Sequence, residues 1–315
     1  MAKYRNDLPL GNGDLFLLDG GLETTLVFHE GMDLPHFASF PLLEDAKGRA
    51  FLRNYYVQYL AIAWAARTGF ILDSPTWRAN PDWGAKLGYG TDRLIAVNKD
   101  AIAMLIALRE EHETARLPIV VSGNIGPRGD GYDPAEIMTV AEARDYHAMQ
   151  VRAFAEAEAD MIHVLTMTNV EEATGVALAA RDAAMPLALS FTVETDGRLP
   201  TGQALDEAIR AVDEATGGSP AYFMINCAHP SHFAALLDTD EAWVKRIRGL
   251  RANASRCSHA ELDEATELDD GNPAELGEDY RALLRRQPQI NVLGGCCGTD
   301  HRHVEAICGA IRLAA

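Results

Sequence analysis

The sequence has few basic residues for its size and no long apolar run. It carries 28 lysines and arginines against 46 aspartates and glutamates, a formal net charge of −18 at pH 7. Because so negative a surface repels phosphate backbones, nucleic acid is excluded as an expected partner, and cationic small molecules are favoured. No apolar stretch approaches the roughly 18 residues needed to span a membrane, and the first residues lack the apolar core of a signal peptide. We therefore expect a cytoplasmic protein with no membrane partner.

Cysteine is also scarce. The chain has five cysteines in 315 residues, an odd number without the regular spacing of a disulfide framework. Such usage is typical of a reducing compartment, where thiols bind metals or take part in chemistry. The sequence therefore predicts thiols rather than disulfides.

Eight short apolar stretches alternate with longer helical patterns, which predicts an α/β fold with a parallel sheet or a closed barrel. No G-x-G-x-x-G follows the first stretch, and eight units fill one barrel without a second domain. We therefore predict a single-domain (β/α)₈ TIM barrel over residues 1–315 rather than an open doubly wound sheet. The eight stretches are residues 15–21, 69–75, 118–126, 160–166, 186–193, 221–227, 247–255 and 290–297.

Start signals mark some of the helices. Thr139 with Glu142, and Asn169 with Glu172, have the spacing of capping boxes. The acidic segment 258–280 is longer than an ordinary strand-to-helix loop. We expect it to be partly helical and to cover the rim of the barrel.

Several of the predicted strands begin with apolar residues and end with polar ones. The end residues are Asp19, Asp73, Ser122, Asn226 and Cys227. In a (β/α)₈ barrel all the carboxyl ends of the strands open onto one face, where active sites are built. These side chains are therefore predicted to gather at one rim.

Three cysteines end two of these strands. Cys227 ends the sixth, and Cys296 and Cys297 end the eighth, within "GGCCGTD". Three thiolates suit Zn²⁺ and leave its fourth position open for water or substrate. The alternatives are a buried apolar Cys227 and a disulfide between the adjacent cysteines. Cys257, in a polar loop, and Cys308, in a helical pattern, are not expected to be ligands.

Histidines follow both groups of cysteines. His229 and His232 come after the first, and His301 and His303 after the pair. Each is compatible with a fourth metal ligand, but the simpler interpretation places them in loops and at helix starts. His163, within a predicted strand, is expected to be a hydrogen-bonded interior residue.

Five segments together resemble the homocysteine S-methyltransferase family, which includes betaine- and S-methylmethionine-dependent enzymes. They are "LLDGGLETTL", "SGNIGP", "SFTVETDGRLPTGQAL", "INCAHP" and "GGCCGTD", and the resemblance runs from about residue 15 to 310. It implies a (β/α)₈ barrel with zinc held by Cys227, Cys296 and Cys297. It also implies a thiol acceptor, homocysteine, and a sulfonium or quaternary ammonium methyl donor, both small molecules.

The resemblance also implies substrate-binding residues. Asp19 of "DGG", beside Gly20, matches the family aspartate that contacts the bound amino acid, and a turn-forming Asp19 is the alternative. Asn226 is expected to orient the site through hydrogen bonds. Trp77 and Tyr132 are candidates to hold a cationic donor near the rim, against a simple packing role. No catalytic residue beyond the metal site is assigned.

The chain departs from the family pattern at three places. Leu165 stands where the family has the glutamate that holds the amino group of homocysteine, and Pro75 stands where it has an asparagine. The early Trp-Ser motif is altered to "HFASF". Three hypotheses therefore remain open: methylation of homocysteine to methionine, the same zinc chemistry on another thiol or onium compound, and a zinc-containing barrel that acts only by binding.

Overall fold

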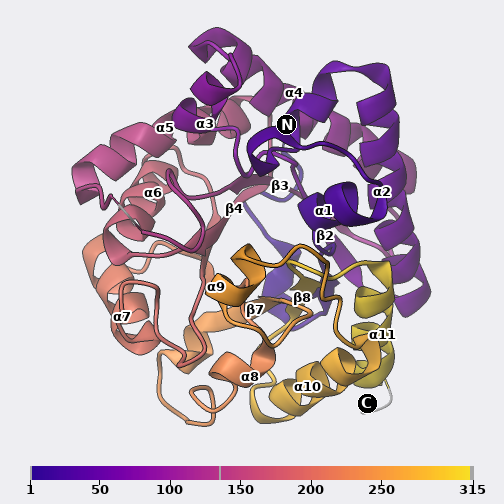
Figure 1. Ribbon diagram of the computed structural model, residues 1–315, viewed down its shortest axis with the longest axis vertical. Coiled ribbons are helices and arrows are strands. Elements are labelled where there is room, and N and C mark those ends of the chain that lie inside the picture. The colour runs from indigo at the N-terminus through magenta and orange to yellow at the C-terminus, as the bar shows by residue number, and fades with distance from the viewer. Residues whose placement is uncertain (1, 135, 313–315) are drawn as a thin grey trace.

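The computed structural model describes residues 2–134 and 136–312. Eight parallel strands close into a barrel in chain order, with β1 pairing to both β2 and β8 (Figure 1). The predicted barrel is confirmed, and every predicted stretch coincides with a strand, although β4 continues one residue past the end of its stretch. The strands are β1 Phe16–Leu17, β2 Gly69–Asp73, β3 Ile119–Ile125, β4 Met161–Met167, β5 Leu187–Phe191, β6 Tyr222–Asn226, β7 Ile247–Ala252 and β8 Val292–Gly295.

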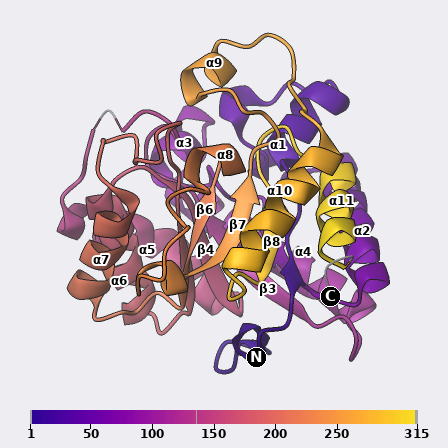
Figure 2. The same ribbon diagram turned by 90° about the horizontal axis from the view of Figure 1, so that it is seen from below.

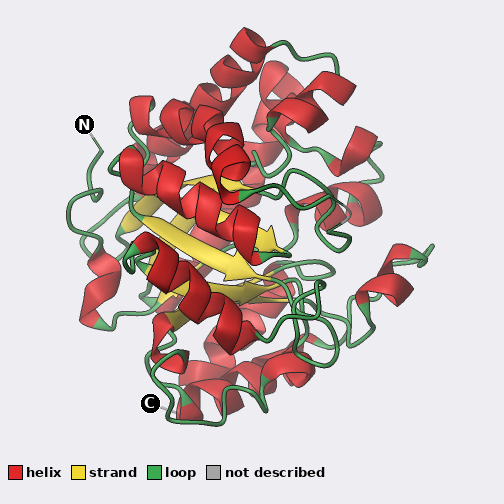
Figure 3. Ribbon diagram, turned by 90° about the vertical axis from the view of Figure 1, so that its left-hand side faces the viewer, coloured by secondary structure: helices red, strands yellow, loops and turns green. Residues whose placement is uncertain are grey.

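Helices surround the barrel on all sides (Figure 3). Within the described ranges, none of them combines the length and apolar character that crossing a bilayer requires. The α-helices are α1 Leu22–Thr24, α2 Ala46–Ala66, α3 Pro81–Lys86, α4 Thr91–His112, α5 Val140–Glu156, α6 Val170–Asp182, α7 Leu205–Thr216, α8 Pro230–Phe233, α9 His259–Asp263, α10 Pro273–Arg286 and α11 His301–Arg312. The predicted helical part of segment 258–280 corresponds to α9 and the first half of α10.

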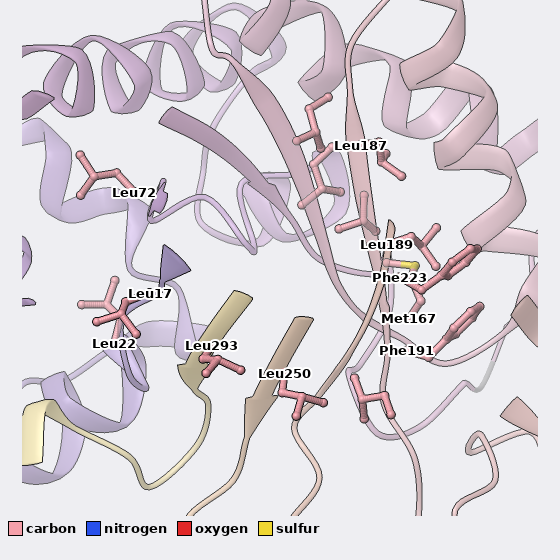
Figure 4. Close-up of a cluster of buried hydrophobic side chains, with 14 of the residues drawn as sticks. Leu17, Leu22, Leu72, Met167, Leu187, Leu189, Phe191, Phe223, Leu250 and Leu293 are labelled. Carbon is pink, nitrogen blue, oxygen red and sulfur yellow. The ribbon is translucent and has the colours of Figure 1, made fainter. Parts of the chain in front are cut away.

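The main core lies between the strands and the helices. Strands of a parallel barrel are covered on both faces, so they are apolar almost throughout. Phe191 of β5 and Phe223 of β6 stack with ring centroids 6.3 Å apart (Figure 4). On α7, buried residues such as Leu205, Ile209 and Val212 share one face at helical spacing. This packing fixes the strands, and therefore the rim residues, in place.

The two ends of the barrel are closed differently. The N-terminal segment lies under one end, and α9 lies over the other (Figure 2). At the first end, Tyr4 N donates to Asp160, and the Arg5 guanidinium donates to the Ala159 carbonyl. A second apolar cluster that includes Phe16 and Met161 fills the barrel at this end. The carboxyl ends of the strands, and all the predicted site residues, are at the α9 end.

The local start signals were only partly correct. Thr139 and Glu142 form the predicted capping box on α5. Asn169 accepts from the Glu172 N–H, but the Glu172 side chain does not return to it. That carboxylate instead accepts from the Arg128 N–H, because it is drawn into a buried contact. Ser122 was predicted at a strand end and lies in the middle of β3, because the strand continues through "SGNI".

Candidate metal and substrate site

The three predicted cysteines come together at the rim. Cys227 directly follows β6, and Cys296 and Cys297 directly follow β8; their three Sγ atoms lie within 4.8 Å of one another. Cys227 has a φ of 53°, and Gly298 a φ of 77°, so the backbone turns sharply at both strand ends. These turns let adjacent cysteines face the same point. In the part of the chain that the structure describes, no other group of three or more acidic, histidine or cysteine side chains is so arranged.

One pairing within this group differs from the prediction. Cys227 and Cys296, whose Cα atoms are 5.4 Å apart, are joined as a disulfide. The expectation that these residues are thiols is therefore wrong for this pair, and the predicted alternative, a disulfide between adjacent cysteines, is not found either. The physical reason is geometric: side chains that converge on one point from two strand ends also come within disulfide reach. Thiolates are needed for metal binding, so this pair must be reduced first.

The sulfur group has the donor set that zinc prefers. Three sulfur donors from two strand ends would leave a bound zinc ion one position for a further ligand, the pattern of a catalytic rather than a structural site. Cys297 lies 3.9 Å from Cys227 Sγ, and burial raises the pKa of its thiol. A divalent cation between the sulfurs would offset that cost by stabilising the thiolate forms. The three residues therefore fit a zinc ion.

Asn226, the last residue of β6, is held by a buried hydrogen-bond network. Its Oδ1 accepts from Ser190 Oγ at 2.6 Å and from the Thr166 N–H at 2.8 Å. Its Nδ2 donates to Thr166 Oγ1 at 2.8 Å and lies 3.9 Å from Cys296 Sγ. The amide thus ties three strand ends together beside the sulfurs.

Gly20 contributes its backbone. Its carbonyl accepts from the Tyr55 hydroxyl and from Arg251 Nη2, both at 3.1 Å. A Cβ atom at this position would lie 2.9 Å from the Thr299 carbonyl, so a side chain does not fit without a shift of the backbone. The turn after β1 therefore requires glycine here.

A buried guanidinium lies below the sulfurs, and sequence reasoning missed it. Arg251 of β7 lies 2.8 Å from Asp19 Oδ1 and 2.9 Å from Asp73 Oδ2, and its Nε donates to the Gly295 carbonyl. Burial raises the pKa of Asp19 to about 6, although Arg251 attracts its charged form. An arginine within an apolar stretch was a signal in itself, because arginine is rarely buried without a partner.

Asp73 has a second partner that was correctly predicted to be interior. His163 Nδ1 lies 2.8 Å from Asp73 Oδ1, and its Nε2 lies 2.8 Å from the Tyr222 hydroxyl. Burial alone would raise the pKa of Asp73, but His163 and Arg251 outweigh it and hold that pKa below its usual range. The carboxylate is therefore charged and engaged on both sides.

Two cavities meet at the sulfurs. The inner one runs into the barrel between the strand ends, and the outer one lies under the 258–270 segment. The residues that line both are Thr24, Phe37, Trp77, Thr166, Cys227 and Cys297. Asp19, Gly20, Asn226 and Leu165 line the inner cavity only. The sulfur group thus stands where two adjoining binding spaces meet.

The outer cavity is walled by aromatic and acidic side chains. Tyr132, a predicted rim residue, places its hydroxyl 3.5 Å from Cys297 Sγ and stacks on His259 of α9 at 4.0 Å. His259 Nε2 lies 2.7 Å from the Cys227 carbonyl. Trp77, the other predicted rim residue, lines both cavities. The prediction that the acidic segment covers the rim is therefore confirmed.

The residues expected to be bystanders lie outside the sulfur group. His229 caps α8, and His232 faces the Arg256 carbonyl. His303 contacts Asp300. His301 begins α11, Cys308 is buried in the same helix, and Cys257 lies in the loop after β7.

The positions that depart from the family pattern also line the inner cavity. Leu165 and Pro75 form part of its wall, and neither brings a charge. Ser39, from the altered "HFASF" motif, donates to Glu23 Oε1 at 2.7 Å. The sequence analysis does not identify Glu23 as a site residue, because a strand predicted over residues 15–21 gives no sign of the helical turn α1 that follows.

Comparison with known proteins agrees with this geometry. The chain is 24% identical to homocysteine S-methyltransferase 4 of Zea mays, over 95% of this chain and 90% of that protein. It is also 24% identical to selenocysteine Se-methyltransferase of Brassica oleracea var. italica, over 94% and 88%. In structure it resembles the homocysteine methyltransferase MmuM of Escherichia coli. The TM-score is 0.73 for the oxidized form, at 20% identity over 93% and 95% of the chains, and 0.70 for the metallated form, at 17% identity over 96% of each.

These structural similarities, at such low identity, establish the fold. The assignment to a family comes from the sequence model described as homocysteine S-methyltransferase, which matches residues 16–311. That range includes all eight strands and the three rim cysteines. The chain therefore belongs to the homocysteine S-methyltransferase family.

Proposed function

We propose that this protein is a zinc-dependent methyltransferase that moves a methyl group from a sulfonium or quaternary ammonium donor to the thiol of homocysteine, giving methionine. The observation that carries the proposal is the position of the three rim sulfurs where two cavities meet. One cavity then takes the acceptor and the other the donor.

Cys227, Cys296 and Cys297 would hold the zinc ion. When bound, the metal would lower the pKa of an acceptor thiol at its fourth position and leave the sulfur nucleophilic. The disulfide between Cys227 and Cys296 must be reduced for this, which suits the cytoplasmic location that we propose. Asn226 keeps Cys296 in place through its contacts with Thr166 and Ser190.

The transfer itself needs an in-line approach. The acceptor sulfur forms a bond to the methyl carbon while the bond from that carbon to the cationic sulfur or nitrogen breaks. The electron pair of the broken bond stays on the donor atom, which becomes neutral, and the thiol proton leaves to solvent. Acceptor and donor in adjoining cavities can adopt this alignment before reaction. The chain's part is to position both.

The outer cavity suits a cationic donor. Aromatic faces attract an onium group, and Trp77 and Tyr132 both line this cavity. Four acidic side chains also line it, those of Asp130, Asp263, Glu267 and Asp269, against one arginine, Arg78, which lies over the Trp77 ring and pairs with Asp130. A neutral leaving group is held less tightly by these charges than the cation that enters, which favours its release.

A second candidate is the same chemistry on a different acceptor. The observation behind it is Leu165, which leaves β4 without a carboxylate to bind an amino group. The substrate would then be a thiol other than homocysteine, or a different onium compound. A barrel that binds zinc and ligands without turnover is the third possibility, and the experiment below separates it from both enzymes.

The test is metal content and methyl transfer in reduced protein. We expect one zinc per chain, with strong loss of zinc and at least a hundredfold loss of transfer in Cys296→Ser and Cys297→Ser, because three ligands are needed for a stable site. Cys257→Ser, in a nearby loop, is the matched control and should behave as wild type. Full zinc in both ligand variants would refute the ligand set, and tight zinc without transfer to any thiol would favour the binding protein.

A further inference from the structure

The inner cavity holds an excess of negative charge. Three carboxylates line it, those of Asp19, Glu23 and Asp73, against one guanidinium, that of Arg251. Arg251 is engaged by Asp19 and Asp73. A ligand that enters this space therefore meets a net negative wall, and a positively charged group is favoured there.

Glu23 is the carboxylate without a cationic partner. It lies in α1, and its Oε1 accepts from Ser39 Oγ at 2.7 Å. Among the described residues, no lysine, arginine or histidine forms an ion pair with it. Burial raises the pKa of this carboxyl, although the Ser39 hydrogen bond and the more distant charges of Arg251 and Arg78 act in the opposite direction.

Other acceptor atoms of the same cavity also lack a donor. Asp19 is only 4% exposed, and its Oδ1, although close to Arg251, receives no aligned hydrogen bond. Asn124 Oδ1 is likewise buried without a partner. Both residues line the inner cavity with Glu23. Because buried polar atoms are normally paired, this wall is short of hydrogen-bond donors.

We propose that Glu23, assisted by Asp19, binds the α-ammonium group of the acceptor and so replaces the carboxylate that β4 lacks at Leu165. This inference rests on the proposed function, because it assigns the acceptor to the inner cavity. An ammonium group brings three N–H donors and one positive charge, which is what the wall lacks. The acceptor is then an amino thiol, and the substitution at Leu165 does not remove homocysteine from consideration.

The acceptor fits Glu23 better than the onium centre of the donor does. A sulfonium or quaternary ammonium centre carries no N–H, so it cannot donate to Glu23, Asp19 or Asn124. Glu23 also lies in the inner cavity wall and not in the outer one. Glu23 and Cys297 both line this inner cavity, so one small molecule bound there can reach both.

The experiment compares homocysteine with 4-mercaptobutanoate, which keeps the thiol and the carboxylate but has no amino group. Binding to the reduced, zinc-loaded protein is measured by calorimetry without donor, and KM and kcat are measured with donor. We expect Glu23→Gln to weaken homocysteine roughly tenfold or more in Kd and KM, with kcat nearly unchanged. 4-Mercaptobutanoate should bind wild type and variant alike. Glu30→Gln, an exposed carboxylate of the adjoining helical segment, is the control.

A second variant protects the test against misfolding. Glu23→Asp keeps the negative charge, but its shorter side chain moves the carboxylate away from the cavity. It should therefore also weaken the binding of homocysteine without changing that of 4-mercaptobutanoate. Three results would overturn the Glu23 assignment. The Glu23 variants would weaken both thiols equally, or they would change only the KM of the donor. Alternatively, the wild type would bind homocysteine and 4-mercaptobutanoate with equal Kd. If binding discriminates as expected but no methyl is transferred, the proposed reaction fails while the ammonium site stands.

Discussion

At the scale of single residues, Arg251 organises the rim beneath the sulfurs. Its guanidinium contacts Asp73 at the end of β2, and the carbonyls of Gly20 after β1 and Gly295 of β8. Because Arg251 itself belongs to β7, its side chain connects the ends of four strands, β1, β2, β7 and β8. A buried charge of this kind is destabilising when its partners are removed, because the remaining charges lose both water and counter-ion.

Replacing Arg251 should therefore be costly. We predict that Arg251→Met lowers the free energy of unfolding by about 3 to 5 kcal/mol, because it leaves Asp19 buried without its cation and Asp73 with His163 as its remaining partner. Urea titration of the reduced protein measures this. Arg49→Met, at an ion pair with Asp100 that is about half exposed, is the control and should cost about 1 kcal/mol or less. A loss at Arg251 no larger than at Arg49 would show that the network does not stabilise the fold.

The same variant has a defined pH dependence. The pKa of Asp19 is raised to about 6 in the folded protein, by burial against the attraction of Arg251, and it rises further when Arg251 is absent. A carboxyl whose pKa is higher in the folded than in the unfolded state destabilises the fold increasingly as pH rises. The loss in free energy of unfolding caused by Arg251→Met should therefore be larger at about pH 8 than at about pH 5. A deficit that is larger at the lower pH would contradict this account.

At the scale of elements, two capping boxes of the same chemistry stand in different surroundings. Thr139 caps α5, a helix of 17 residues that packs against α6. Ser258 caps α9, a helix of five residues over the outer cavity. Loss of a cap of this type costs about 1 kcal/mol wherever it occurs. The surroundings decide whether the whole barrel or one segment responds.

We predict that Thr139→Ala lowers global stability by about 1 kcal/mol, while Ser258→Ala leaves it nearly unchanged and loosens residues 259–268. The helix α5 is part of the packed outer layer, so its cap is lost only when the barrel unfolds. Denaturant titration measures the free energy of global unfolding, and amide hydrogen exchange of α5 and α9 measures local opening. Equal global effects would mean that α9 folds together with the barrel.

Much of this element scale follows from the sequence, and the limits are physical. Alternating apolar stretches were enough to predict the eight strands, because a covered barrel needs them. Most strand ends were predicted too late in the sequence, as at β1, because apolar and small residues continue into the turns at Gly20 and Cys227. The ion pairs of Arg251 and the position of Glu23 depend on contacts between distant segments, which periodicity does not encode.

At the scale of the whole molecule, the site and the main source of stability are separate. The packed core lies between the strands and the helices. The barrel end away from the sulfur group holds a second apolar cluster and is closed by the N-terminal segment. The sulfur group occupies only the rim, where Cys227, Cys296 and Cys297 follow their strands. A small zinc finger, in contrast, has no adequate core without its metal.

We therefore predict that chelation of zinc from the reduced protein abolishes methyl transfer but leaves the barrel folded. Its circular dichroism spectrum should be unchanged, because a chain of this size buries a core that does not include the rim. Adding zinc back should raise the Tm with metal concentration, as expected for a ligand that binds the folded state. The same titration of Cys297→Ser should show a much smaller shift. Unfolding on chelation would make the metal structural, and full transfer in verified zinc-free protein would exclude the metal from the reaction.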